Sequence, residues 1–135
     1  MGRVDDVINI AGHRLSTGEM EEVLGKSAYV AECAVIGRND ALKGQIPVGF
    51  VVLKTDVNEP EKTIEENLVQ LIRNEIGAVA ALKEIFIVPG LPKTRSGKIL
   101  RKTMRQIFNK EEFIVPSTIE NPNILEDIKS AIEKS

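Results

Sequence analysis

The segment from Val48 to Lys54 is nearly all apolar, and it constrains the fold more than any other part of the chain. A strand that faces water on one side alternates apolar and polar residues, whereas an unbroken apolar run is typical of a strand covered on both faces. We therefore expect Val48 to Lys54 to form a central strand. A neighbouring strand is predicted from Val30 to Gly37, where turn-forming residues follow it.

Helical and strand-like patterns on either side of these segments supply the other elements. We predict strands at 7–10 and 83–88, a turn at 11–14, an interruption at 44–47, helices at about 17–26, 63–76 and 124–132, and one more helix that begins near Lys98 and includes Phe108. Ser16 and Glu19 have the spacing of a capping box, and Thr63 is expected to cap the second helix. The order predicts an α+β domain, a small sheet with flanking helices.

Charge is unevenly distributed along the chain. Residues 91–110 carry seven cationic side chains and no acidic one, whereas the other 115 residues hold 11 cations and 20 anions. A concentrated basic segment on an acidic body indicates an anionic ligand at that segment. The alternative is an ordinary solvated basic helix face.

Composition excludes several classes of protein. The chain has no apolar run of about 18 residues, so we predict no membrane span. One cysteine, Cys33, rules out an internal disulfide and favours an intracellular protein. With one histidine besides, a zinc site built from these ligands is excluded, and we predict no metal site. The absence of Trp and the presence of one Tyr leave few stacking platforms, so nucleic-acid binding is the weaker interpretation of the basic segment.

The segment from Pro92 to Lys98 is the strongest candidate for chemistry. It contains three cations, two hydroxyl side chains and a glycine within seven residues. Such a segment packs poorly into a core but binds anions well. Lys98, at the expected start of a helix, could neutralise negative charge that develops on a carboxylate or phosphate. The alternative is a solvent-facing lysine in the first turn of that helix.

The segment from Gly2 to Arg14 is a second candidate. Gly12 permits close backbone approach, and the Arg14 guanidinium can make a bidentate contact with a phosphate. Asp5 and Asp6 are adjacent on an extended chain, so their carboxylates point to opposite faces and form no metal pair. A turn or hinge is the better interpretation. Because the chain begins directly in this pattern, we expect it to be part of a longer protein.

Taken together, the two segments resemble the small C-terminal domain of adenylate-forming acyl-CoA synthetases. The resemblance covers nearly the whole chain, with the family domain over 1–112 and an extended tail with a short helix over 113–135. Further stretches are similar to the short-chain branch, and to propionyl-CoA and acetyl-CoA synthetases in particular: 15–22, 31–37, 41–45 and 117–120. Ser27 stands where acetyl-CoA synthetases have a histidine near a cation site, so the resemblance implies no metal here.

The resemblance implies a role for individual residues. Lys98 matches the lysine that enters the active site for adenylation, and that lysine is also a target of reversible acylation. The remaining matches are nucleotide contacts at Arg3 and Arg14, the CoA path at Ala11 and Gly12, the CoA phosphates at Arg73, and the hinge at Asp5. Arg73 could equally be an ordinary surface arginine of its helix.

The implied function is that of an acid–thiol ligase, which converts propionate or acetate, ATP and CoA to acyl-CoA, AMP and pyrophosphate. ATP and CoA enter as substrates, Mg2+ accompanies ATP, and this domain binds none of them stably alone. The implied partner is an N-terminal adenylation domain of the same polypeptide, in the cytoplasm or the mitochondrial matrix. We therefore expect the isolated chain to be inactive. The alternative is a stand-alone module that binds an anion or nucleic acid through residues 93–110.

Overall fold

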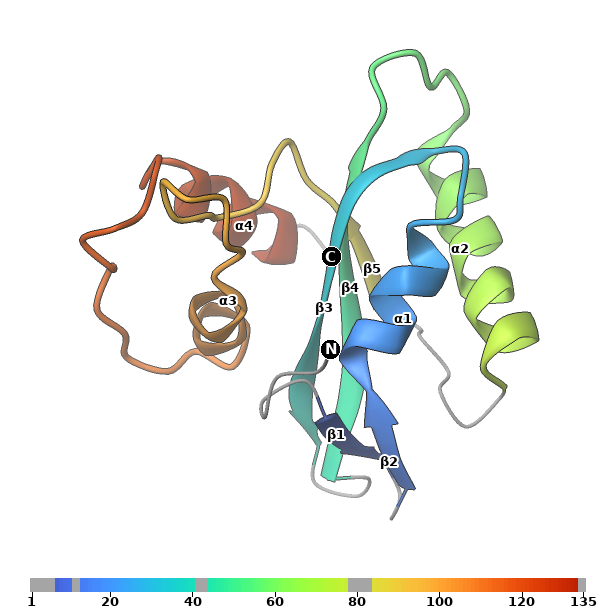
Figure 1. Cartoon of the computed structure of the whole chain (residues 1–135), viewed down its shortest axis with the longest axis horizontal. Helices are drawn as coiled ribbons and strands as arrows, with labels where there is room; N and C mark the ends of the chain where they lie inside the picture. The colour runs from blue at the N-terminus through green and yellow to red at the C-terminus, as the bar shows by residue number, and fades with distance from the viewer. Residues whose placement is uncertain (1–6, 11–12, 41–43, 78–83, 134–135) are drawn as a thin grey trace.

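The structure is a computed structural model that describes residues 7–10, 13–40, 44–77 and 84–133. Five strands form one mixed sheet in this part of the chain, and helices cover both of its faces (Figure 1). The strands are β1 (Val7–Ile10), β2 (His13–Ser16), β3 (Val30–Asp40), β4 (Gly44–Leu53) and β5 (Glu84–Ile87). The helices are α1 (Thr17–Leu24), α2 (Glu61–Glu75), α3 (Arg101–Phe108) and α4 (Ile124–Glu133). The α+β prediction is confirmed.

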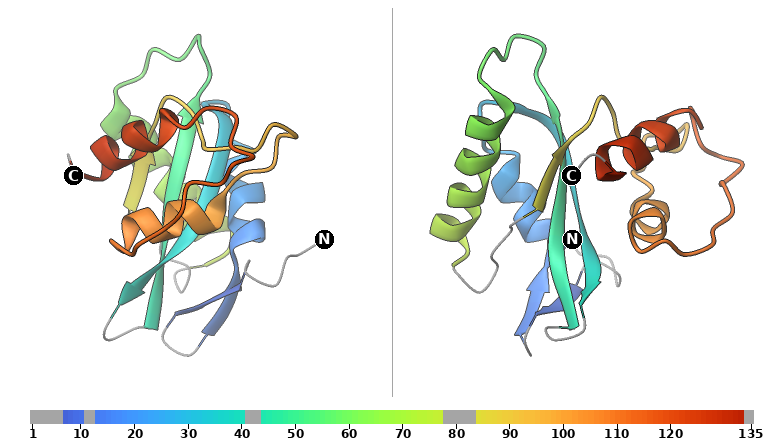
Figure 2. Two further views of the ribbon diagram at one scale, coloured as in Figure 1. Left: turned by 90° about the vertical axis from the view of Figure 1, so that its left-hand side faces the viewer. Right: turned by 180° about the vertical axis from the view of Figure 1, so that it is seen from behind.

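The long hairpin of β3 and β4 is the centre of the fold. The two strands pair antiparallel from Val30 opposite Leu53 to Asp40 opposite Gly44. On the other side of β4, β5 pairs parallel to it, and β1 meets it at Gly44. The path β2-β1-β4-β3 leaves β3 as an outermost strand of the sheet. Helices α1 and α2 lie on one side of the sheet, and α3 and α4 lie on the other (Figures 1 and 2).

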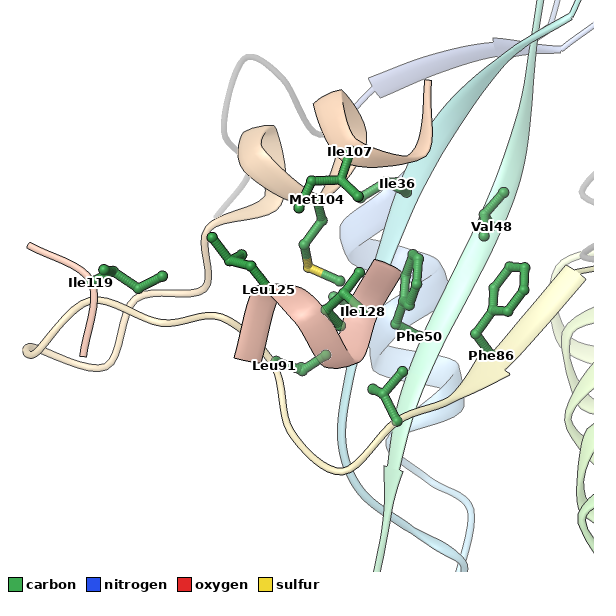
Figure 3. Close-up of a cluster of buried hydrophobic side chains, with 12 residues drawn as sticks. Ile36, Val48, Phe50, Phe86, Leu91, Met104, Ile107, Ile119, Leu125 and Ile128 are labelled. Atoms are coloured by element: carbon green, nitrogen blue, oxygen red, sulfur yellow. The ribbon is translucent and has the colours of Figure 1, made fainter. Parts of the chain in front are cut away.

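Alternating side chains of the central strands supply two separate cores. Val35 and Val51 point to the side of α1 and α2, whereas Ile36 and Phe50 point to the side of α3 and α4. On the second side the Phe50 and Phe86 rings stack with centroids 5.4 Å apart (Figure 3). The prediction that the segment from Val48 onward is covered on both faces is therefore confirmed.

Several local predictions were wrong. His13 and Arg14, predicted to lie in a turn, belong to β2, which pairs antiparallel with β1. The turn-forming residues predicted after Gly37 belong to β3, which continues to Asp40. β4 runs through Pro47, which lies opposite Gly37. The N–H of Val35 points away from β4. Because N–H directions alternate along an antiparallel pair, the nitrogen of Pro47, two residues further along the ladder, points away from β3. On that side of β4 the pairing with β5 begins only at Val48, so no hydrogen bond to a described strand is lost at Pro47. Helix α2 begins at Glu61, so Thr63 is not its cap.

The last part of the chain belongs to the second core. Leu125 and Ile128 of α4 are buried against the residues of α3 and the sheet. Ile119, in the irregular segment before α4, is 6% exposed. Residues 118–128 thus contribute apolar surface to the fold in the same way as the elements before them.

Candidate functional site

Residues 92–100 form a short hairpin, which we call the Lys98 hairpin. Its two arms are joined by a bridge between Lys93 and Ile99, and the Leu100 amide donates to the Pro92 carbonyl oxygen at 2.9 Å. At the tip, the Thr94 amide donates to the Lys98 carbonyl oxygen at 2.8 Å, and the Lys98 amide donates to the Thr94 hydroxyl at 3.1 Å. These bonds fix the backbone on both sides of Lys98.

The tip of the hairpin requires a glycine. Gly97 has a φ of +91°, a backbone conformation that residues with a side chain rarely adopt. Its amide donates to the Thr94 carbonyl oxygen at 2.9 Å, which closes the turn. The serine and glycine that precede Lys98 therefore build a turn, and the turn presents the lysine.

A segment of the C-terminal region pairs with the hairpin. The Arg95 amide donates to the Thr118 carbonyl oxygen at 3.0 Å, and the Glu120 amide donates to the Lys93 carbonyl oxygen at 2.8 Å. Ile119, between them, is buried in the second core. The hairpin is thus anchored to the core through a third stretch of backbone.

Ion pairs hold both ends of the hairpin. The Lys93 ammonium pairs with the Glu32 carboxylate of β3 at 2.5 Å. The Arg101 guanidinium makes two hydrogen bonds to the Glu21 carboxylate of α1, at 2.8 and 2.5 Å. Two of the seven cations of residues 91–110 are therefore neutralised inside the domain.

Lys98 differs from these two cations. Its side chain is exposed, and in the described part of the chain no carboxylate forms an ion pair with it. Helix α3 begins at Arg101, so the prediction that Lys98 starts this helix was wrong. Arg95 and Lys102, which are close to Lys98 in the sequence, are also exposed. The hairpin presents an ammonium that can contact an anion outside this domain.

The other predicted site residues lie elsewhere. Arg73 is exposed in the last turn of α2, on the side of the sheet opposite α3, so the structure does not bring it to Lys98 (Figure 1). Arg14 lies in β2, opposite Asn9 of β1. Four predicted site residues fall outside the described residues: Arg3, Asp5, Ala11 and Gly12.

Sequence reasoning missed Glu21 and Glu32, which hold the hairpin. Glu32 leaves a trace in the sequence, because it is the one charged residue in the otherwise apolar and neutral run from Val30 to Gly37. Glu21 leaves none, since its partner Arg101 lies 80 residues away.

The described residues contain no group of three potential His, Cys, Asp or Glu metal ligands. Within the same ranges, no helix has the length and apolar character needed to cross a membrane.

Comparison with known proteins agrees with this architecture. Residues 19–98 match the family described as the AMP-binding enzyme C-terminal domain. The chain is 51% identical over 134 residues to the acyl-CoA synthetase short-chain family member B, mitochondrial, of Dictyostelium discoideum. The aligned region covers 99% of this chain and 20% of that protein. It is 44% identical over 135 residues to acetyl-coenzyme A synthetase 1 of Debaryomyces hansenii, and the aligned region covers 98% of this chain and 20% of that protein.

A solved structure gives the same result at the level of the fold. The crystal structure of the Brucella canis acyl-CoA synthetase superposes with a TM-score of 0.71 at 35% identity, over 78% of this chain and 19% of that one. The chain thus spans about a fifth of the length of the proteins it matches. Its sequence and its fold agree with one assignment: the chain belongs to the AMP-binding enzyme C-terminal domain family.

Proposed function

We propose that this chain is the C-terminal domain of a short-chain acyl-CoA synthetase, an acid–thiol ligase. In the first half-reaction a carboxylate oxygen attacks the α-phosphorus of ATP, and pyrophosphate leaves to give acyl-adenylate. In the second, the CoA sulfur attacks the acyl carbon, loses its proton, and AMP leaves to give acyl-CoA. Propionate and acetate are the proposed acids.

In this proposal Lys98 serves the first half-reaction. The attacking carboxylate and the triphosphate are both anionic, so their approach is opposed by charge repulsion. An ammonium placed between them offsets that repulsion and orients the reacting oxygen. The observation that supports this role most directly is the exposed Lys98 side chain at the tip of a hairpin whose arms are fixed by hydrogen bonds and ion pairs.

The remaining roles concern substrates and movement. Arg3 and Arg14 would contact the nucleotide, Ala11 and Gly12 would leave room for the pantetheine chain, and Arg73 would meet the CoA phosphates. Asp5 would serve as the hinge between this domain and an N-terminal adenylation domain of the same polypeptide. The position of Arg73, on the face of the sheet away from Lys98, fits a domain that rotates between the two steps.

We assign no Mg2+ ligand to this chain. Mg2+ would enter with ATP and neutralise its phosphates, and the described residues offer no cluster of three potential ligands to hold it. Acylation of Lys98 would remove the positive charge and stop adenylation, so the same exposed amine is a proposed control point. We place the protein inside the cell, in the cytoplasm or the mitochondrial matrix, where its substrates would be available.

The proposed division of labour predicts that this chain has no activity alone. The experiment compares the purified chain with the full-length enzyme that carries it, each supplied with propionate or acetate, ATP and CoA. Acyl-CoA formation by the full-length enzyme only is expected, because the ATP and acyl pockets would lie in the N-terminal domain. Conversion by the isolated chain at comparable rates would overturn the proposal.

A further inference from the structure

β3 is an outermost strand of the sheet, so one of its edges has no neighbouring strand among the described residues. Val35 lies opposite Gly49 of β4, yet its amide donates to the Glu21 carboxylate at 2.8 Å instead of to β4. The N–H of Val35 therefore points out of the sheet. An outermost strand carries a row of such N–H groups, and each one needs a partner.

The Glu21 carboxylate accepts a hydrogen bond from this edge and links two helices on opposite sides of the sheet. Its helix, α1, lies on the opposite side of the sheet from α3 (Figure 1). The carboxylate accepts from Val35 and, at the same time, from two nitrogens of Arg101 at the start of α3. The Glu21 and Arg101 side chains are 13% and 15% exposed, so water screens this pair little. A bidentate pair of this kind fixes direction as well as distance.

Helix α3 is held at both ends against β3. At its first residue, Arg101 meets Glu21, which in turn binds the Val35 amide. At its end, the Asn39 amide of β3 donates to the Asn109 side-chain oxygen at 3.2 Å. Arg101 follows the Lys98 hairpin directly, so the first attachment also fixes the end of that hairpin.

We propose that Glu21 is a positioning residue for Lys98, acting through Arg101; this inference rests on the proposed function of Lys98 in adenylation. Glu21 holds the start of α3, the start of α3 holds the second arm of the hairpin, and the hairpin aims the ammonium. Without the carboxylate, Arg101 loses its bidentate contact with α1, and the hairpin arm that ends at Arg101 loses that attachment. A displacement of about 1 Å at a reacting group is enough to slow a reaction by as much as about 100-fold.

The test uses Glu21→Gln in the full-length enzyme and measures the two half-reactions separately. Adenylation is followed by acid-dependent exchange of pyrophosphate into ATP, and thiolysis by acyl-CoA formation from supplied acyl-adenylate and CoA. We expect the adenylation rate constant to fall at least about tenfold with thiolysis within about twofold of wild type. A purely structural role would lower both half-reactions together, since both would follow the folded fraction. Equal loss in the two halves, or no loss in either, overturns the inference.

Two further variants make the result specific. Glu84→Gln breaks another partly buried ion pair, between Glu84 of β5 and Arg38 of β3, which does not touch the Lys98 hairpin. Adenylation by this control should stay within about twofold of wild type. Arg101→Lys keeps the positive charge but cannot make the bidentate contact with Glu21. It therefore tests the Glu21–Arg101 contact from the other side if Glu21→Gln does not fold. It should lower adenylation more than thiolysis, and an unchanged ratio counts against the inference.

Lys98→Ala, measured beside these variants, separates the two levels of the argument. If Lys98→Ala leaves adenylation intact, the proposed function of Lys98 fails. If Lys98→Ala removes adenylation and Glu21→Gln does not lower it, the positioning role alone fails.

Discussion

The backbones of Thr94 and Lys98 are linked in both directions, by a 2.8 Å hydrogen bond from the Thr94 amide to the Lys98 carbonyl oxygen and by a 3.1 Å bond from the Lys98 amide to the Thr94 hydroxyl. The exposed ammonium thus extends from a backbone that is itself fixed. Gly97 lies inside this turn with a φ of +91°. The conformation of one glycine is therefore coupled to the direction of the lysine.

Gly97→Ala and Gly77→Ala should reduce the free energy of unfolding by similar amounts, but only Gly97→Ala should slow adenylation. Both glycines have a positive φ, and an added Cβ would meet no atom within 4 Å at either position. Each substitution should therefore cost about 1–2 kcal/mol in free energy of unfolding, through backbone strain alone. Only Gly97→Ala should also lower the rate of adenylation, because Gly77 follows α2 and not the hairpin. Urea unfolding and a pyrophosphate-exchange assay measure the two effects; equal adenylation rates in the two variants would contradict this account.

Cys33 should make the stability of the domain depend on pH in alkaline solution. Burial and the nearby Glu21 carboxylate raise the pKa of the Cys33 thiol from 9.0 to about 11, and the Arg101 guanidinium opposes this shift. Because the folded-state pKa is the higher one, the unfolded chain loses its thiol proton first as the pH rises. The contribution of this group is complete below pH 9 and is lost between pH 9 and about 11.

The measurement is the free energy of unfolding across that pH range for wild type and Cys33→Ala. Other groups titrate there in both proteins, so only the difference between the two curves reports on the thiol. Wild type should lose stability more steeply than the variant. Parallel curves would show that the thiol pKa is not raised by folding.

Phe50→Ala should be among the most destabilising single changes in the second core. The side chain is fully buried, stacks on Phe86 and meets the Phe108 ring edge-on with centroids 6.4 Å apart. Truncation of such a residue typically costs about 3–5 kcal/mol. The control is Ile114→Ala, because Ile114 is 91% exposed and its truncation should change the free energy of unfolding by less than about 0.5 kcal/mol. A small loss for Phe50→Ala, measured by urea unfolding, would mean that the core refills the space.

The sequence predicted those features of the fold that depend on local pattern. The unbroken apolar run from Val48 identifies a strand buried on both faces, and Ser16 does accept a hydrogen bond from the Glu19 amide at the start of α1. The start of β4 was missed because a proline argues against a strand. That rule fails where the nitrogen of Pro47 lies on a side without a partner.

The candidate site was predictable as a motif but not as a structure. The run of cations around Lys98 is visible in the sequence. Which of these cations are neutralised is not, because Glu21 and Glu32 come to Arg101 and Lys93 from distant positions. Long-range ion pairs leave no periodicity in a sequence, so the difference between a cation that holds the domain together and a cation that faces outward appears only in three dimensions.

The most direct test of the account is Lys98→Ala in the full-length enzyme, with the neighbouring exposed Lys102→Ala as the matched control. Both side chains are exposed, so both variants should unfold within about 0.5 kcal/mol of wild type. Lys98→Ala should lower adenylation by about 100-fold or more and leave thiolysis of supplied acyl-adenylate within about twofold of wild type, while Lys102→Ala should keep both. Intact adenylation in Lys98→Ala, or an equal loss of both half-reactions, would contradict the central claim that this lysine acts between two anionic reactants.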